Sequence, residues 1–513
     1  MLQEHRPINR SALFSDETVN FRNPVECDPG DLVHIRMRTA KDNVSQVVVR
    51  SLGKEYPMKK VRTEGRFDYY ETALTCGETL LLYDFKITGE NGKEVCYYDR
   101  QGVWEQPDGK VAFEVIPGFH APQWPRGKVF YQIYVDRFFN GDPTNDVLDH
   151  EYRYIDEKHV EKVKDWHTYP EASDVHRFYG GDLQGVLDKL DYLQYLGVEV
   201  LYLNPIFVSP SNHKYDTQDY SAVDPHFGKL VVDEGDVLEA GEQDNQKATR
   251  FISRVTRKEN LEASNELLAS LIAEAHKRGM YVILDGVFNH CGSFHKWMDR
   301  EKIYHKQEGY HPGAYISGMS PYRSYFAFTE KEWPDNGHYE GWWQYHTLPK
   351  LNYEDSLALQ KEVLDIGAKW MSPPFNADGW RLDVAADLGH SDVFNHKFWQ
   401  KFRKAVKDVS SEKLILAEHY GDPAPWLRGD EWDSFMNYDG FMEPVSWFLT
   451  GMEKHSDRFE AGMLNNGAAF FHAMMRNLAK LQVGTALCAM NELSNHDHSR
   501  FLTRTNRVAG RIG

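Results

Sequence analysis

An apolar stretch that carries two opposite charges constrains this chain more than any other feature. Residues 380–385 are apolar except for Arg381 and Asp383, and Gly379 precedes them. This composition predicts a strand buried on both faces, as in a parallel sheet. Burying a charge is costly unless the group is paired with an opposite charge or faces a cleft. The stretch therefore predicts either a structural ion pair in the core or the wall of an active site.

Two later carboxylates follow apolar runs in the same way. Glu418 comes directly after residues 414–417, and Asp497 follows the run 486–490 after a short polar segment. Three acids that leave the carboxyl ends of different strands are typical of an enzyme built on a parallel β/α barrel. An aldolase or a metal-dependent barrel would need a strand-end lysine or a cluster of metal ligands, and the sequence offers neither.

From Val129 onward, strand-like runs alternate with amphipathic helices. One helix is expected between an N-cap at Asp182 and Gly197, and another over 265–278. Strands are expected near 129–134, 198–203, 281–284, 379–384, 414–417, 434–437 and 485–490. Seven such alternating units predict an α/β fold of the (β/α)8 TIM-barrel type.

The first part of the chain has a different pattern. Residues 32–38, 46–50 and 80–87 alternate apolar and polar side chains, which predicts half-buried antiparallel strands. We expect an N-terminal β-sandwich over 1–120, like a carbohydrate-binding module, and a catalytic barrel domain over 121–513.

Two long segments interrupt the alternation. Residues 229–262 are polar and predict a surface insertion that is either functional or disordered. Residues 291–352 are rich in aromatic side chains and glycine, and they predict a subdomain inserted after the third strand.

Composition excludes some classes of partner. The chain has 513 residues and a formal net charge of -18, so neither nucleic acid nor an anionic membrane surface is an expected partner. The five cysteines have no CxxC spacing and predict reduced thiols. With no apolar signal-like run near the start, we expect a cytoplasmic protein.

Several motifs resemble those of the α-amylase family of glycoside hydrolases (family 13), and the likeness covers almost the whole chain. These motifs are 285–290, 379–387, Glu418 and His496-Asp497. Residues 348–352 (Leu-Pro-Lys-Leu-Asn) resemble the fingerprint of the neopullulanase, cyclomaltodextrinase and maltogenic amylase branch. The segment after Glu418 is closer to amylopullulanase catalytic modules.

The resemblance implies a role for each motif residue. Asp383 would be the nucleophile, Glu418 the acid/base, and Asp497 a stabiliser of the transition state, with the first two carboxyl groups about 5–5.5 Å apart in a retaining enzyme. Arg381 would keep Asp383 ionised. The implied substrate-binding residues are Tyr215 as a stacking platform, His290 and His496 as hydrogen-bond donors, Asn289 beside them, and Asp285, whose role is more structural. A core or surface position is the alternative for each histidine, and simple packing for the tyrosine.

A cluster of oxygen-bearing side chains follows the first strand. Such a cluster suits a hard cation, and a turn held by side-chain hydrogen bonds is the alternative. The resemblance implies a structural calcium ion held by Asn140, Asp142, Asn145, Asp146, Gly180 and Asp182. Asp182 cannot serve fully as both a helix cap and a metal ligand.

The chain ends at Gly513, before the eighth barrel unit and the C-terminal β-domain of the family, so we expect a fragment of a longer protein. The predicted function is a retaining α-glucan hydrolase that cleaves α-1,4 bonds, with α-1,6 bonds as a further target, in maltodextrins, cyclodextrins or pullulan. The alternatives are an α-glucan transferase or branching enzyme of the same family, or a non-catalytic carbohydrate-binding relative. A homodimer through the N-terminal domain is also expected.

Overall fold

The computed structural model describes residues 6–106 and 111–508, which form two compact units. Of the described residues, the first unit contains those up to Pro122, 420–494 and 499–508. The second unit contains residues 123–419 and 495–498. The candidate active site lies in the second unit.

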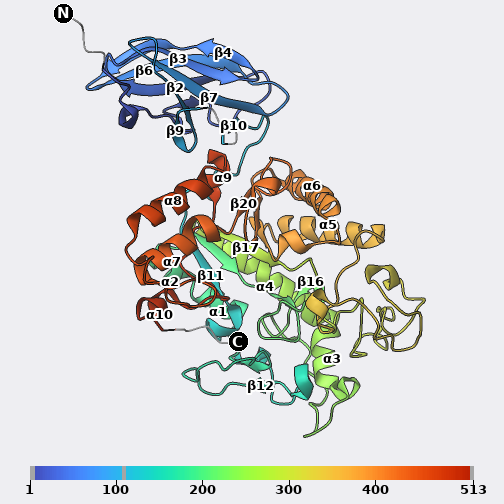
Figure 1. Ribbon diagram of the computed structural model, residues 1–513. Coiled ribbons are helices and arrows are strands. Elements are labelled where there is room, and N and C mark those ends of the chain that lie inside the picture. The colour runs from blue at the N-terminus through green and yellow to red at the C-terminus, as the bar shows by residue number, and fades with distance from the viewer. Residues whose placement is uncertain (1–5, 107–110, 509–513) are drawn as a thin grey trace, which may run out of the picture. The chain divides into compact units, whose positions relative to one another are not determined.

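The N-terminal part of the first unit is a sandwich of two antiparallel sheets (Figure 1). One sheet has the order β1 (Arg22–Asn23), β2 (Leu32–Ala40), β6 (Phe67–Thr75), β5 (Lys59–Glu64). The other has the order β4 (Lys54–Pro57), β3 (Val44–Ser51), β7 (Leu81–Gly89), β8 (Val95–Asp99), β9 (Gly102–Trp104), with β10 (Phe113–Val115) paired to β7. Every second residue of β2, including Val33, Ile35 and Met37, is buried in the core between the sheets. The predicted sandwich is confirmed.

A curled parallel sheet forms the core of the second unit. Its strands are β11 (Phe130–Ile133), β14 (Val200–Leu203), β17 (Tyr281–Gly286), β18 (Gly379–Leu382) and β19 (Leu414–Ala417). Each strand pairs in parallel with the next one along the chain. All residues of β14, β18 and β19 are buried, because helices cover the outer face of the curl. The sheet is a half-barrel, which confirms the predicted parallel α/β fold.

Helices alternate with these strands and continue after β19. In the second unit they are α1 (Leu183–Asp188), α2 (Leu190–Tyr195), α3 (Thr249–Thr256), α4 (Lys258–Lys277), α5 (Leu357–Met371) and α6 (Asp392–Val409). In the first unit they are α7 (Glu443–Thr450), α8 (Gly467–Leu478), α9 (Val483–Cys488) and α10 (Phe501–Thr505). Asp182 caps α1 by accepting a hydrogen bond of 2.6 Å from the backbone N of Gly185, as predicted. Gly197, with φ of 79°, follows α2 in the left-handed conformation that glycine adopts without strain.

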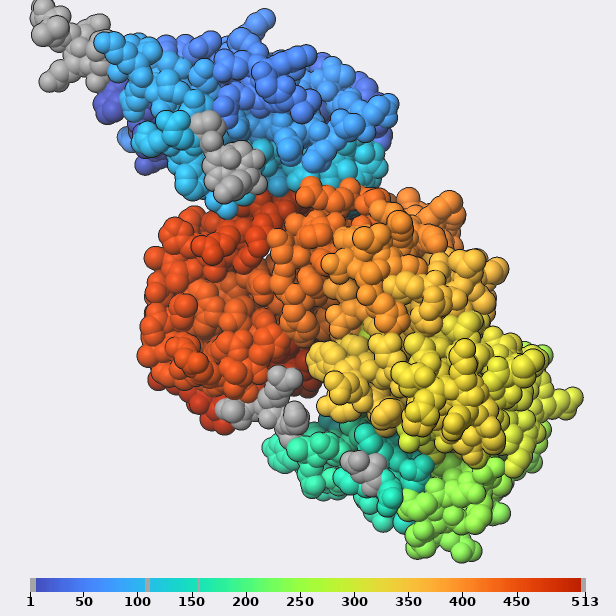
Figure 2. All heavy atoms as spheres, turned by 45° about the vertical axis from the view of Figure 1, so that its right-hand side comes forward, coloured from blue at the N-terminus to red at the C-terminus, as the bar shows by residue number. Residues whose placement is uncertain are grey.

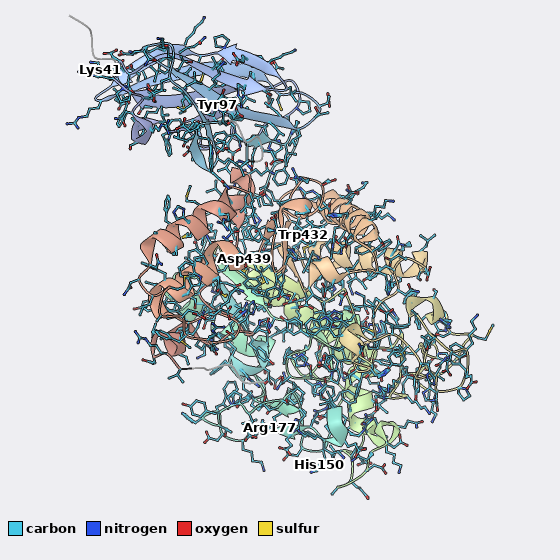
Figure 3. The ribbon with its side chains drawn as sticks, in the orientation of Figure 1. Lys41, Tyr97, His150, Arg177, Trp432 and Asp439 are labelled. Carbon is cyan, nitrogen blue, oxygen red and sulfur yellow. The ribbon has the colours of Figure 1, made fainter. Side chains whose placement is uncertain are left out.

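Short strand pairs complete the second unit. β12 (Glu161–Lys162) pairs with β13 (Arg177–Phe178), and β15 (Phe207–Val208) pairs with β16 (Asp219–Val223). β12 and β13 belong to the long segment between β11 and α1, in which Figure 3 labels His150 and Arg177.

The prediction of a strand at 485–490 is wrong. These residues form most of α9, and Met490 alone makes a single parallel bridge, to Met436. Gly484 and Cys488 are buried at helical spacing, whereas Leu487 is 51% exposed. A short apolar run fits a buried strand or one face of a helix, and here the helical period decides. The strand predicted at 434–437 is the shorter β20 (Ser434–Phe435) of the first unit.

The polar segment 229–262 is more ordered than a surface loop. It contains all of α3 and the first turn of α4. Arg254 of α3 is buried and forms ion pairs of 2.8 Å with Glu151 and with Asp233. Sequence polarity did not reveal this helix because its inward face contains an arginine that is neutralised only by distant carboxylates.

The inserted segment 291–352, all of which the structure describes, contains short 3-10 turns and isolated β-bridges but no β-strand. Its core is aromatic and includes Trp297, Tyr304 and Tyr325. Figure 2 shows it as the contiguous yellow region of the surface.

Two further sequence features have clear outcomes. All five cysteines are buried free thiols, as predicted, and the sulfur atoms of Cys27 and Cys76 lie 3.0 Å apart. Among the described residues, no helix combines the length and the hydropathy needed to cross a membrane.

Candidate active site

The guanidinium of Arg381 is surrounded by three carboxylates. Its Nη1 atom lies 3.0 Å from Asp285 Oδ1 and 2.9 Å from Asp383 Oδ1, and its Nη2 atom lies 2.9 Å from Glu418 Oε2. Arg381 and Asp285 are fully buried, and Asp383 and Glu418 are 9% and 3% exposed. The pair predicted from the apolar strand is thus part of a larger cluster, because three acids from three strand ends share one cation.

Backbone pairing between the strands brings these side chains together. Asp285 of β17 lies opposite Arg381 of β18, and Leu382 lies opposite the last residue of β19, directly before Glu418. The N–H of Asp383 donates to the carbonyl of Gly286 at 3.0 Å. The carboxyl ends of neighbouring parallel strands meet on one side of a sheet, so Asp285, Asp383 and Glu418 converge there.

The chain turns sharply after Asp383. Strand β18 ends at Leu382, earlier than the predicted end, and Val384 has φ of 35° and ψ of 48°. A β-branched residue in this left-handed region is strained, and such strain concentrates at functional sites. The turn lets the N–H of Val384 donate to Glu418 Oε2 at 3.0 Å, and the N–H of Ala385 donates to the Glu418 carbonyl at 3.2 Å. The turn therefore orients Asp383 and holds Glu418.

Burial and charge act in opposite directions on the acids of this cluster. Burial raises the pKa of Asp383 well above its usual value, and the nearby Glu418 and Asp285 raise it further, whereas Arg381 lowers it. Burial also raises the pKa of Asp285, against the same arginine. One cation cannot neutralise three anions in a low-dielectric site, so the arginine only partly offsets the rise in the pKa of Asp383 and Asp285.

Tyr215 stands beside the cluster. Its hydroxyl donates to Asp285 Oδ2 at 2.9 Å and accepts from Asn204 Nδ2 at 3.2 Å. The ring is stacked on His496, with ring centres 5.2 Å apart and 9° between the planes. The predicted platform and a predicted histidine are thus neighbours.

Three residues that the sequence analysis missed complete this network. The Tyr202 hydroxyl donates to Asp285 Oδ2 at 2.7 Å. Gln132 Nε2 donates both to Asn204 Oδ1 and to His496 Nδ1, each at 2.8 Å. These residues lie in or directly after β11 and β14. Their position at strand ends was the only available signal, because a lone Tyr, Gln or Asn has many other roles.

His496 and Asp497 enter from the far end of the sequence. His496 Nε2 lies 3.4 Å from Asp497 Oδ2, and the side chain of Asp497 is 40% exposed. His496 thus lies on the Tyr215 ring and is held by the hydrogen bond from Gln132. The carboxylate of Asp497 is accessible to solvent.

His290 is held by protein partners on both ring nitrogens. Nε2 donates to the Tyr215 carbonyl at 3.1 Å, and Nδ1 accepts from Asn289 Nδ2 at 3.1 Å. Burial lowers the pKa of His290 to about 3, so its ring is neutral at neutral pH. Its ring stacks on Trp342, with centres 4.6 Å apart and planes at 7°.

Lys350 was not among the predicted site residues although it lies within the 348–352 fingerprint. Its ammonium donates to Asn289 Oδ1 and to the backbone carbonyl of Asp387. Burial lowers the pKa of Lys350 to about 8. A buried lysine on Asn289 fixes which way that amide points, and therefore which atom faces His290.

The predicted calcium residues lie close together in the segment between β11 and α1. Asn140 Nδ2 donates to Asp146 Oδ1 at 2.8 Å, and a Cβ added to Gly180 would lie 2.1 Å from that same oxygen. The side-chain oxygens of Asn140 and Asn145 are buried and accept no hydrogen bond from any described residue. Such orphaned acceptors fit a hard cation.

Two predicted ligands are engaged in local hydrogen bonds instead. Asp142 Oδ1 accepts from the backbone N of Thr144 at 3.0 Å, which is the alternative of a hydrogen-bonded turn. The Asp182 carboxylate accepts from three backbone N–H groups and from the Asn145 amide; the backbone donors are Gly141, Asp142 and Gly185. In addition, the Lys162 ammonium forms an ion pair with Asp146 Oδ2. The donor set for a cation is thus strongest at Asn140, Asn145 and Asp146. No group of three or more His, Cys, Asp or Glu side chains suited to a metal occurs in the described part of the chain.

Acids gathered around one arginine at the carboxyl ends of a curled parallel sheet are typical of an enzyme whose catalytic groups are carboxylates. Family comparison identifies its class. Residues 132–239 and 263–512 match the alpha amylase catalytic domain, and residues 25–116 match the alpha amylase N-terminal ig-like domain. The chain belongs to the alpha-amylase family and is a glycoside hydrolase. The catalytic match omits residues 240–262, which include α3.

The similar proteins agree with this assignment. The chain is 32% identical over 98% of its length to a cyclomaltodextrinase of Thermoanaerobacter pseudethanolicus, of which it covers 76%. It is 34% identical over 86% of its length to neopullulanase 2 of Thermoactinomyces vulgaris, of which it covers 63%. The solved type III pullulan hydrolase from Thermococcus kodakarensis has a TM-score of 0.62 and 25% identity, covering 96% of this chain and 74% of that one.

Proposed function

We propose that this glycoside hydrolase cleaves α-1,4-glucosidic bonds, with α-1,6 bonds as a further target, in maltodextrins, cyclodextrins or pullulan. The observation that carries the proposal is the contact of one buried guanidinium with both Asp383 and Glu418. It supports a pair of carboxylates held close enough to act on one glycosidic bond. The names of the similar proteins, a cyclomaltodextrinase, a neopullulanase and a pullulan hydrolase, support the substrate class.

In the proposed mechanism, Asp383 attacks the anomeric carbon while Glu418 protonates the leaving glycosidic oxygen. The bond from the anomeric carbon to that oxygen breaks, and an ester to Asp383 forms. Water then attacks the same carbon, Glu418 takes its proton, and Asp383 leaves with its electron pair, so the anomeric configuration is retained. The first step needs Asp383 ionised and Glu418 protonated, which fits a cluster with fewer cations than acids; in the second step Glu418 is ionised and takes the proton of water.

The surrounding residues would position the sugar. The exposed carboxylate of Asp497 is available to sugar hydroxyls, and the anchored Tyr215 ring offers a flat apolar face. Arg381 would oppose the effect of burial on Asp383 and so favour its attacking form. A calcium ion held by Asn140, Asn145 and Asp146 would have a structural role, because these residues link the loop after β11 to the start of α1.

The test is sugar release from maltodextrin, β-cyclodextrin and pullulan by the chain and by its Asp383→Asn variant. We expect the substitution to reduce release by at least about 10³-fold. The matched control is Asp365→Asn, an exposed carboxylate on α5 paired only with Lys361 among the described residues, which should retain full activity. Release that survives in Asp383→Asn would contradict the proposed nucleophile. Products longer than the substrate would indicate a transferase instead.

A further inference from the structure

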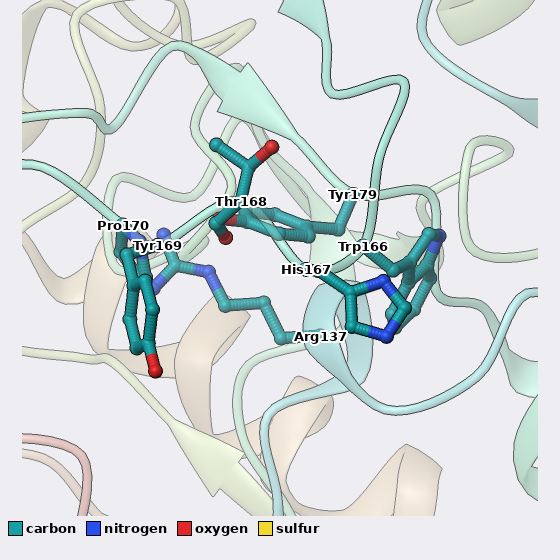
Figure 4. A pocket seen from close by; sticks show the side chains of 7 residues that line it. All are labelled: Arg137, Trp166, His167, Thr168, Tyr169, Pro170 and Tyr179. Carbon is teal, nitrogen blue, oxygen red and sulfur yellow. The ribbon is translucent and has the colours of Figure 1, made fainter.

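A pocket lined by aromatic rings lies in the segment between β11 and α1. Its volume is about 500 Å³, and Trp166, His167, Thr168, Tyr169 and Tyr179 line it together with Arg137. Figure 4 shows the Arg137 side chain between Tyr169 on one side and Trp166 and His167 on the other. This volume lies within the usual range for small-molecule sites, about 300–1,000 Å³.

Two large aromatic side chains are left exposed at this pocket. Tyr169 is 87% exposed and Trp166 is 40% exposed, although neighbouring Tyr179 is buried. Tyr179 is fixed: its hydroxyl donates to the Thr168 carbonyl at 2.7 Å, and its ring meets Trp166 edge-on at 5.9 Å. The pocket therefore has a rigid wall and two ring faces open to a ligand. Clustered exposed aromatic groups of this kind mark binding sites.

Arg137 supplies a hydrogen-bond donor without a free charge. Its Nη2 atom lies 3.1 Å from Asp174 Oδ1, and its guanidinium sits 5.2 Å from the ring centres of both Tyr134 and Tyr179. Its Nε atom is buried and donates to no acceptor among the described residues. A buried donor without a partner is costly, which a ligand oxygen would correct. Because Asp174 balances the charge, a neutral hydroxyl suits this position better than an anion.

The pocket and the candidate active site use neighbouring stretches of the chain. The Tyr134 hydroxyl donates to Asn212 Oδ1 at 2.9 Å, and Asn212 Nδ2 donates to the carbonyls of Asp174 and Arg177 at 3.0 and 2.8 Å. Asn212 lies three residues before Tyr215. Strand β11 carries Gln132 toward His496, and Arg137 follows a few residues later. Both sites thus adjoin strand β11, and Asn212 of the loop that carries Tyr215 bonds to the segment that forms the pocket.

We infer that this pocket is a glucan-binding subsite, which takes a glucosyl unit of an α-glucan chain whose cleaved bond lies at Asp383 and Glu418. The ring faces of Trp166 and Tyr169 pack on the apolar face of the sugar, and Arg137 Nε donates to one of its hydroxyls. The inference rests on the proposed function for its ligand class. Long substrates reach the subsite, and short ones do not.

The test measures binding of maltoheptaose and of maltose to the full chain carrying Asp383→Asn, by titration calorimetry. Trp166→Ala and Tyr169→Ala, each added to this background, should weaken maltoheptaose binding by about fivefold to tenfold and leave maltose binding unchanged. Tyr195→Ala is the matched control, because Tyr195 is 88% exposed on α2 and does not line the pocket. The exposed position of Tyr169 means that its variant should unfold at the same urea concentration as the parent. Binding of cellopentaose, a β-linked glucan, should not depend on either residue.

The outcomes separate this inference from the proposed function. Equal maltoheptaose affinity in the parent, both pocket variants and the control overturns the subsite, even if the wild-type chain cleaves glucans. Weaker binding in the pocket variants supports the subsite, even if the wild-type chain releases no sugar. An equal loss for maltose also overturns it, because that result would indicate damage to the main site. No binding of any glucan overturns both.

Discussion

Arg381 contacts three acids of the candidate active site. It is fully buried and touches Asp285, Asp383 and Glu418, so removing it would leave three acids without a cation. Asp285 in turn receives two tyrosine hydroxyls, from Tyr202 and Tyr215. Hydrogen bonds to a buried charge are stronger than neutral ones, so these contacts stabilise the arrangement beyond what packing alone provides.

The first prediction concerns the Tyr215 hydroxyl. Tyr215→Phe keeps the ring that stacks on His496 but removes the donor to Asp285. Because a hydrogen bond to a charged group contributes about 1.5–3 kcal/mol, we expect kcat/KM for maltodextrin to fall by about 10- to 100-fold. Tyr195→Phe, on an exposed helix face, serves as the control. Unchanged kinetics in Tyr215→Phe would show that Asp285 does not depend on this donor.

The second prediction concerns Lys350 and pH. Its folded pKa of about 8 lies below that of an unfolded lysine, so between about 8 and 10.4 the unfolded chain binds more protons. The free energy of unfolding therefore rises with pH in this window, by up to about 3 kcal/mol from this group. Below about pH 8 the lysine is protonated in both states, and this group adds no pH dependence. In urea unfolding across pH 7–10.5, the free energy of unfolding of the wild type should rise by this amount relative to that of Lys350→Met. A difference independent of pH would contradict the effect of burial.

At the scale of elements, strand ends and helix starts do most of the positioning. The left-handed Val384 turns the chain after β18, so that Asp383 and Glu418 are held by one turn. Asp182 caps α1 and also accepts from Gly141 and Asp142, which ties the loop after β11 to the helix. Asn145 and Asp146 in that loop supply the oxygens for the proposed calcium ion.

The third prediction tests this cation site. If calcium binds only the folded chain, an excess of 100 times Kd should add about 2.7 kcal/mol to the free energy of unfolding relative to EDTA. Asn145→Ala should lose most of this gain, because it removes a buried oxygen. Asn91→Ala, which alters a hairpin turn of the sandwich, should retain it. Identical unfolding curves in EDTA and calcium would mean that the Lys162 ammonium alone balances Asp146.

At the scale of the whole molecule, the charge distribution fits a neutral substrate. The formal net charge is -18, and Arg381 of the candidate site and Arg137 of the aromatic pocket are each paired with acids. Neither therefore offers a free positive field to steer an anionic ligand.

The fourth prediction follows from this charge. We expect KM for maltodextrin to change by less than about twofold between 0.02 and 0.5 M NaCl, since screening does not act on an uncharged substrate. Steady-state rates at fixed pH provide the measurement. A steep dependence on salt, with the fold intact by circular dichroism, would indicate a charged ligand.

The sequence alone determined the sandwich, the order of the parallel strands and the acids at their ends. These features are local, because period-two alternation, buried apolar runs and helix caps are encoded within a few residues. Only the tertiary structure showed that residues 483–488 are helical, that α3 is buried through Arg254, and that Gln132, Tyr202 and Lys350 join the site. The aromatic pocket also belongs to this second group. Each depends on partners far away in the chain, and the energy of a buried polar contact is set by which partner the fold brings to it.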